Sequence, residues 1–261
     1  MEYTGIFDTH AHYDDARFDE DRDAVLGALP GHGVSLVMDP ACSLDSIDAS
    51  IGLSNRYGFV YSAAGVHPEA AEEDAHGDWI KKVEEACSNR KVRAVGEIGL
   101  DYHYDIPKEL QKMVFEEQIK LSLDVDLPVI VHDREAHGDT MELLEKYRPK
   151  GIMHCYSGSA EMVKELVKLG FYIGFTGSVT FKNASKLLLA AEAVPEDRLL
   201  LETDCPYMAP VPYRGQRCDS TMITATAQRL AEIRGTDAQS IIDDARRNGC
   251  RVYGIETGER E

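Results

Sequence analysis

The feature that most constrains the fold of this 261-residue chain is a short, apolar, β-rich run that recurs eight times along it. Such near-continuous apolar runs are typical of strands that are buried on both faces of a sheet. The runs span residues 5–11, 34–41, 59–68, 92–101, 127–135, 150–158, 170–178 and 198–206.

Segments with helical patterning lie between these runs. In residues 112–123, Phe115, Ile119 and Leu123 recur at a four-residue step, and the amphipathic segment 160–170 ends on a glycine. Eight strand–helix units, with no internal linker, predict a single-domain α/β protein with a (β/α)₈ TIM barrel spanning residues 1–261.

Two further helices are expected after the last strand. Residues 220–235 predict the eighth barrel helix, and the pair Thr236 and Gln239 predicts a capping box that opens another helix running into residues 244–254. An open doubly wound sheet is the alternative fold. It is disfavoured because neither GxGxxG nor GxxxxGK[ST] follows the first strand.

Barrel enzymes carry their chemistry at the carboxyl ends of the strands, because the loops there converge on one mouth. If the segment FDTHAHYD is extended, Asp8, His10 and His12 share one side of it. The ends of the second and seventh strands, MDPA and FTGS, offer few candidate catalytic or metal-binding residues. The other strand ends carry His67, Glu97, Asp101, His132, Arg134, His154, Glu202 and Asp204.

Any one of these histidines is more often a hydrogen-bonded core or loop residue than a ligand. Together, however, such groups are costly to bury unless a metal compensates them. Because six candidate ligands exceed the three of a typical catalytic zinc site, we expect two divalent ions that share Glu97. Asp8 and Glu202 lie deeper and could orient imidazoles or join a buried polar network. The expected ligands are His10, His12, Glu97, His132, His154 and Asp204.

Charge and composition limit the partners. The net charge of −18 removes the basic footprint of a protein that grips duplex nucleic acid along its length. No apolar run reaches membrane-spanning length and no secretory signal precedes the first strand, so a cytoplasmic protein with no membrane association and no obligate protein partner is expected. Six cysteines without a CxxC pair predict reduced thiols, rather than disulfides or a zinc–thiolate site.

The motifs FDTHAH, AAGVHP, GEIGLDY, LPVIVHDREA, HCYSG and LLLETDCPYMAPVPYRG resemble, in order and spacing, those of TatD-type metal-dependent hydrolases. The resemblance implies the same six metal ligands and places His67, Arg134 and Tyr156 near the substrate. It also implies magnesium- or manganese-dependent DNase activity, often of the 3′-5′ exonuclease type. The chain departs from the family pattern at QRCDST after YRG, and it lacks a basic residue after GLDY.

The expected reaction is phosphodiester hydrolysis by a metal-activated water, with Asp204 accepting its proton and Glu97 bridging the ions. The ions could be zinc, manganese or magnesium, and the negative charge favours short or single-stranded DNA ends or a small phosphodiester. His67 and Arg134 would steady the phosphate, although His67 could cap a loop and Arg134 could pair with Asp133 or Glu135. The alternatives are a binuclear amidohydrolase acting on a small amide, lactone or phosphoester, or a non-catalytic metal-binding barrel.

Overall fold

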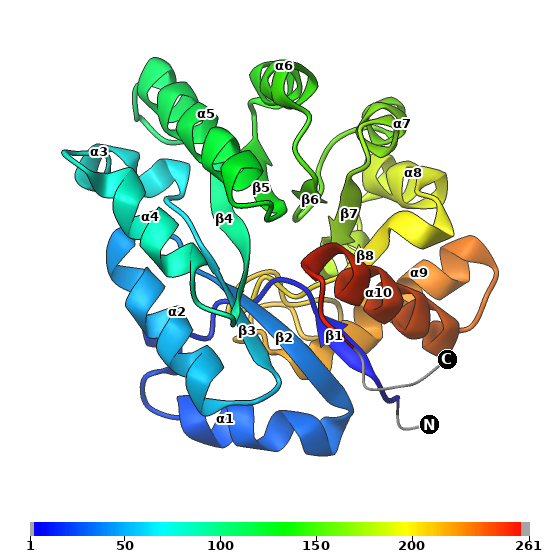
Figure 1. Ribbon diagram of the computed structural model, residues 1–261. Coiled ribbons are helices and arrows are strands. Elements are labelled where there is room, and N and C mark those ends of the chain that lie inside the picture. The colour runs from blue at the N-terminus through cyan, green and yellow to red at the C-terminus, as the bar shows by residue number, and fades with distance from the viewer. Residues whose placement is uncertain (1–2, 257–261) are drawn as a thin grey trace.

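The computed structural model of the protein describes residues 3–256. Eight parallel strands follow one another in chain order around a nearly closed barrel, and helices surround them (Figure 1). The predicted (β/α)₈ class is confirmed. The strands are β1 (Ile6–Asp8), β2 (Val34–Pro40), β3 (Val60–Ala64), β4 (Val92–Asp101), β5 (Val129–Arg134), β6 (Gly151–Met153), β7 (Tyr172–Phe175) and β8 (Leu199–Leu201).

Helices cover the outer face of the barrel. Two of them follow β3 and two follow β8, while the other strands are each followed by one α-helix. The helices are α1 (Arg22–Ala28), α2 (Leu44–Arg56), α3 (Ala71–Asp74), α4 (Trp79–Cys87), α5 (Lys108–Asp124), α6 (His137–Tyr147), α7 (Ala160–Lys168), α8 (Ser185–Ala193), α9 (Ile223–Arg234) and α10 (Ala238–Tyr253).

Helix α5 extends the predicted 112–123 segment at both ends. Its residues Phe115 and Ile119 are fully buried against the sheet, as the spacing predicts. Leu123 is 46% exposed, however. Leu123 therefore lies off the buried face of the helix, which continues through Leu121 and Ser122.

The capping prediction for α10 is wrong by one residue. The helix begins at Ala238, and its N-cap is Asp237, whose carboxylate accepts the Ser240 N–H. Aspartate is a stronger N-cap than threonine, so Asp237 takes the position. The Gln239 side chain instead makes two hydrogen bonds to the backbone of Thr4.

The apolar core has two layers. The larger lies between the sheet and the surrounding helices. The smaller brings together one residue from each of the eight strands, as expected for the filled interior of a barrel, and Tyr253 of α10 joins it. The strand residues of this inner layer are Phe7, Met38, Ala63, Ala94, Ile130, Ile152, Tyr172 and Leu200.

The seam between β1 and β8 is joined just beyond the two strands. Thr9 N–H donates to Leu201 O over 3.1 Å, and Asp204 N–H donates to His10 O over 2.9 Å. Helix α10 packs over this seam (Figure 1), where the Tyr253 hydroxyl donates to Thr9 O. The last helix therefore fastens the first strand to the last.

The predicted domain of residues 1–261 extends at both ends beyond the described residues, so its limits stay a prediction. Within residues 3–256, no helix combines the length and apolar character required to cross a membrane.

The seam predicts unequal effects of two substitutions at Tyr253. Tyr253→Ala removes a large buried side chain and is expected to lower the free energy of unfolding by about 3–5 kcal/mol. Tyr253→Phe removes only the hydrogen bond to Thr9 and is expected to cost about 1 kcal/mol. Urea titration followed by circular dichroism measures both, with exposed Leu189→Ala as a control that changes the value by less than about 0.5 kcal/mol. Equal losses at Tyr253 would contradict this account of the seam.

Candidate metal centre

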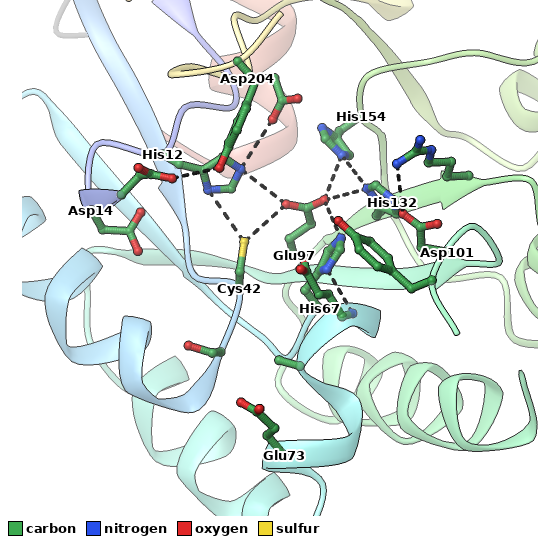
Figure 2. A pocket seen from close by; sticks show the side chains of 17 residues that line it. His12, Asp14, Cys42, His67, Glu73, Glu97, Asp101, His132, His154 and Asp204 are labelled. Carbon is green, nitrogen blue, oxygen red and sulfur yellow. Dashed lines mark hydrogen bonds and ion pairs between the residues drawn. The ribbon is translucent and has the colours of Figure 1, made fainter. Parts of the chain in front are cut away.

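A cavity opens at the carboxyl ends of the strands, where the sequence places its unusual residues. Figure 2 shows their side chains pointing toward one another across it. His10 lies just beneath, fully buried. The predicted site residues that line the cavity are His12, His67, Glu97, His132, Arg134, His154 and Asp204.

The FDTHAHYD segment reaches the site differently from the extended-strand prediction. Strand β1 ends at Asp8, and His10 and His12 follow it. The two Nε2 atoms lie 3.0 Å apart, so these residues do converge. The Asp8 carboxylate instead accepts hydrogen bonds from Thr203 and Ser220. Asp8 thus belongs to a buried polar network that ties the β8 end to the loop before α9.

Glu97 lies at the centre of the site, on β4, and is 3% exposed. Its two carboxylate oxygens face different groups of donors (Figure 2). Oε2 lies 3.1 Å from His10 Nε2 and 3.5 Å from His12 Nε2. Oε1 lies 3.0 Å from His132 Nδ1 and 2.8 Å from His154 Nε2. One carboxylate therefore joins two sets of imidazole nitrogens.

Asp204 belongs to the Oε2 side of this arrangement. Its Oδ1 lies 3.5 Å from His12 Nε2 and 3.9 Å from His10 Nε2. The residue has a φ of 59°, in the left-handed region that aspartate tolerates better than most residues. The six predicted ligands are thus brought together.

Burial and neighbouring charges set the protonation of this cluster. Burial raises the pKa of Glu97, but the imidazoles of His154, His10 and His67 outweigh burial and hold it well below its usual range. Burial and the His154 imidazole lower the pKa of His10 to about 4. Near neutral pH, Glu97 is therefore a carboxylate, and His10 is a neutral imidazole with a lone pair to offer.

Hydrogen bonds to outer partners orient two of the imidazoles. His12 Nδ1 lies 3.2 Å from Pro40 O, and His132 Nε2 lies 3.0 Å from Asp101 Oδ2. Glu202 Oε1 accepts the Cys155 N–H and lies 3.7 Å from His154 Nδ1, too far for a hydrogen bond, so the contacts of Glu202 are those of a buried polar network, the other of its two predicted roles. Burial raises the pKa of Glu202 to about 8, which favours its protonated form near neutral pH.

Helix α5 holds two of the strand ends in place with glutamine side chains. Gln118 accepts from Val66 N–H and donates to Val66 O, next to His67. Gln111 makes the same pair of bonds to the backbone of Asp101. These paired bonds satisfy backbone groups that leave the sheet ladder and fix the loops that carry the site.

Gly99 is required by the close approach of β4 to β5. Its φ is +142°, and a Cβ atom there would overlap the backbone carbonyl of His132. Only glycine combines this conformation with this contact.

His67 caps the 3₁₀ turn that follows it, which agrees with the alternative prediction that it caps a loop. Its side chain also points into the site. Its Nδ1 accepts the Glu69 N–H, so the proton of a neutral ring sits on Nε2, which lies 3.5 Å from Glu97 Oε1. Burial lowers the pKa of His67 to about 3, so the ring is neutral. His67 is therefore a hydrogen-bond donor toward the cavity.

Arg134 lines the cavity, 48% exposed, with Nη1 4.0 Å from Asp101 Oδ2. No ion pair joins Arg134 to Asp133 or Glu135 in the described part of the chain; Asp133 contacts His137 over 2.7 Å, and Glu135 lies 3.6 Å from His103.

Tyr156 does not lie among the residues that line the cavity. Its hydroxyl donates to Ser159 O, and the ring is buried. The structure does not bring Tyr156 into the cavity lining, and its predicted substrate contact stays a prediction.

Sequence reasoning missed two groups in the site. Cys42 lies two residues beyond β2, a strand end that offered little, yet its Sγ is 3.7 Å from Glu97 Oε2. Asp101 was recognised only as a strand-end residue, although it holds His132. For both, the available signal was position just at or after the carboxyl end of a strand.

The QRCDST segment that departs from the family pattern has a structural role. Arg217 forms a two-pronged ion pair with Asp21, and Asp219 caps the 3₁₀ turn before α9. None of residues 216–221 lines the cavity.

The donor set fits divalent cations. His10 and His12 bring two ring nitrogens to 3.0 Å, and His132 and His154 bring two others to 3.3 Å. No lysine or arginine among the described residues forms an ion pair with the Glu97 carboxylate, whose contacts are with imidazoles and the Cys42 thiol. Converging imidazoles and carboxylates are ligands for zinc, manganese, iron or cobalt, whereas magnesium prefers oxygen.

Comparisons with known proteins find metal-dependent hydrolases among the relatives of this chain. A protein of Bacillus subtilis (strain 168), described as the uncharacterized metal-dependent hydrolase YabD, is 38% identical over 256 residues, covering 96% of this chain and 99% of that protein. The 3'-5' ssDNA/RNA exonuclease TatD of Cronobacter sakazakii (strain ATCC BAA-894) is 30% identical over 259 residues, covering 95% and 97%.

The fold comparison points the same way. The crystal structure of YJJV, a TatD homolog from Escherichia coli K12, superposes with a TM-score of 0.90 at 32% identity and covers 97% of this chain and 99% of that one. The family model described as TatD related DNase matches residues 7–254. The chain therefore belongs to the TatD-related DNase family of metal-dependent hydrolases.

Proposed function

We propose that this protein hydrolyses phosphodiester bonds with two divalent cations bound on either side of Glu97. The observation that carries the proposal is the division of donors between the two Glu97 oxygens. One cation would be held by His10, His12 and Asp204 with Oε2, and the other by His132 and His154 with Oε1. Zinc and manganese suit these imidazoles better than magnesium does.

Bound cations would supply a water acidic enough to yield hydroxide near neutral pH and would neutralise charge on the phosphate. The surrounding residues supply the remaining functions. Asp204, an ionised carboxylate at the mouth, is placed to accept the proton of the attacking water. His67 Nε2–H and the Arg134 guanidinium would donate hydrogen bonds to the non-bridging phosphate oxygens.

Charge in the cavity restricts the form of the substrate. Among the described residues lining it, Arg134 is the single arginine or lysine. Four carboxylates face it in addition to Glu97, Asp101 and Asp204. A long polyanion laid across this rim is repelled, whereas one phosphate at a strand end or in a small phosphodiester can be neutralised locally. The proposed substrates are short or single-stranded DNA ends. The four additional carboxylates belong to Asp14, Asp15, Glu69 and Glu73.

The same acidic rim favours a second candidate, a binuclear amidohydrolase acting on a small amide, lactone or phosphoester. Both candidates need the same metal centre, and they differ in the bond cleaved. An assay panel of phosphodiesters, amides and lactones separates them.

Metal content tests the centre directly. The protein purified without chelators is expected to carry about two equivalents of divalent ion by inductively coupled plasma mass spectrometry. Glu97→Gln should lower the content of both ions, because both halves use this carboxylate. Fewer than about half an equivalent in the unmodified protein would refute the centre.

Asp101 should tune metal affinity through His132. Asp101→Asn weakens the hydrogen bond that orients the ring and is expected to reduce affinity by about 10- to 100-fold in a chelator competition titration. The matched control Asp105→Asn, on an exposed loop position, should leave affinity unchanged. A similar loss in both variants would show that general charge, rather than the contact to His132, sets the affinity.

Asp204 should be essential for turnover. Asp204→Ala is expected to reduce the rate at least about 100-fold while circular dichroism stays unchanged.

On oligonucleotides, the unmodified protein should shorten frayed 3′ ends faster than blunt duplexes. Undiminished turnover in Asp204→Ala, or hydrolysis only of amides or lactones, would overturn the proposed reaction.

A further inference from the structure

Cys42 carries a thiol that the proposed two-cation site does not use. It follows β2 and directly precedes Ser43, the N-cap of α2. Its Sγ lies 3.7 Å from Glu97 Oε2 and 3.7 Å from His12 Nδ1 (Figure 2). Of the six cysteines, all of which lie in the described part of the chain, only Cys42 belongs to a His, Cys, Asp and Glu group compact enough to hold a metal ion.

The backbone holds this thiol in place. The N–H groups of Cys42 and Ser43 each donate to Ser46 Oγ over 2.9 Å. The Ser43 bond belongs to the capping box that starts α2, and the Cys42 bond ties the cysteine backbone to the same Ser46 hydroxyl. The position of Sγ beside Glu97 is therefore built into the fold.

The spacing of the donors matches that of ligands to one ion. Zinc–sulfur bonds of about 2.3 Å and zinc–oxygen bonds of about 2.0–2.2 Å at a tetrahedral angle separate the two ligand atoms by about 3.5 Å. The distance from Sγ to Oε2 is 3.7 Å, and that from His12 Nε2 to Oε2 is 3.5 Å. One cation can therefore reach Cys42, His12 and Glu97 together.

We propose that Cys42 is a ligand of the cation on the Glu97 Oε2 side and makes this half of the centre selective for a thiophilic ion such as Zn²⁺. The inference rests on the proposed metal centre and adds to it. The thiol proton leaves to solvent as the sulfur–metal bond forms, with no change in oxidation state. Thiolates favour zinc and other soft ions over magnesium, so the two halves would differ, since the Oε1 side offers only nitrogen and oxygen.

Cobalt substitution tests this proposal with a readout independent of activity. The full-length protein is stripped with a chelator and titrated with Co²⁺, whose binding is followed by visible ligand-field bands and by metal analysis. A thiolate ligand adds a sulfur-to-cobalt charge-transfer band in the near ultraviolet. We expect this band in the unmodified protein, its loss in Cys42→Ser, and its retention in the matched control Cys87→Ser, which alters another half-buried thiol.

The outcomes separate this inference from the metal centre on which it rests. Bound cobalt without the charge-transfer band, or a band that persists in folded Cys42→Ser, would show that Cys42 is only a weak hydrogen-bond donor to Glu97 and would overturn the assignment while leaving the centre intact. No cobalt binding by the unmodified protein would overturn both. The band in the unmodified protein shows that a thiolate binds the ion, and Cys42 is the one cysteine of the described residues in a compact donor group. Loss of the band in Cys42→Ser with unchanged circular dichroism then assigns that thiolate to Cys42.

Selectivity provides a second measurement. Cys42→Ser is expected to lower Zn²⁺ affinity at least about tenfold while changing Mn²⁺ affinity by less than about threefold, in parallel competition titrations. Equal losses for the two ions would contradict a thiolate ligand and indicate a general effect on the Glu97 carboxylate.

Discussion

The buried carboxylate of Glu97 is the constraint on which the rest of the site depends. A carboxylate removed from water costs several kcal/mol unless charges or hydrogen bonds compensate it. In this barrel the compensation comes from five imidazoles, those of His10, His12, His67, His132 and His154. Because these rings approach from four other strand ends, the charge of one residue organises most of the barrel mouth.

Hydrogen bonds and backbone contacts outside this cluster hold its side chains in position. Paired hydrogen bonds from Gln111 and Gln118 of α5 fix two strand ends, and Gly99 allows β4 to approach β5 closely. At the seam, Asp204 is tied to the His10 backbone, and α10 closes over it. The apolar layers of the core therefore stabilise the barrel, whereas polar contacts at the carboxyl ends of the strands orient the side chains of the site.

The two halves of the site are unequal. His132 lies between Glu97 and Asp101, and although burial lowers its pKa, these carboxylates outweigh burial and raise it to about 10. Cation binding must displace that proton, so it competes with acid. The opposite half holds the neutral His10 and the Cys42 thiol. It also holds His12, whose pKa is lowered by burial but raised well above its usual range by Cys42, Asp204 and Glu97 together. The thiol on one side only, together with the acidic rim, supports the proposal that the two halves bind different ions and that one phosphate enters at a time.

The sequence by itself determined the barrel and the six clustered donors, because strand–helix periodicity and the placement of histidines after apolar runs are local properties. Only the tertiary structure decided which partner each donor meets. The Asp8 carboxylate accepts a hydrogen bond from Thr203, and the Tyr156 hydroxyl donates to the Ser159 carbonyl. The Cys42 thiol lies beside Glu97. Such outcomes depend on where β1 stops and how loops from distant strands converge. Residues far apart in the chain set those distances, so no local pattern encodes them.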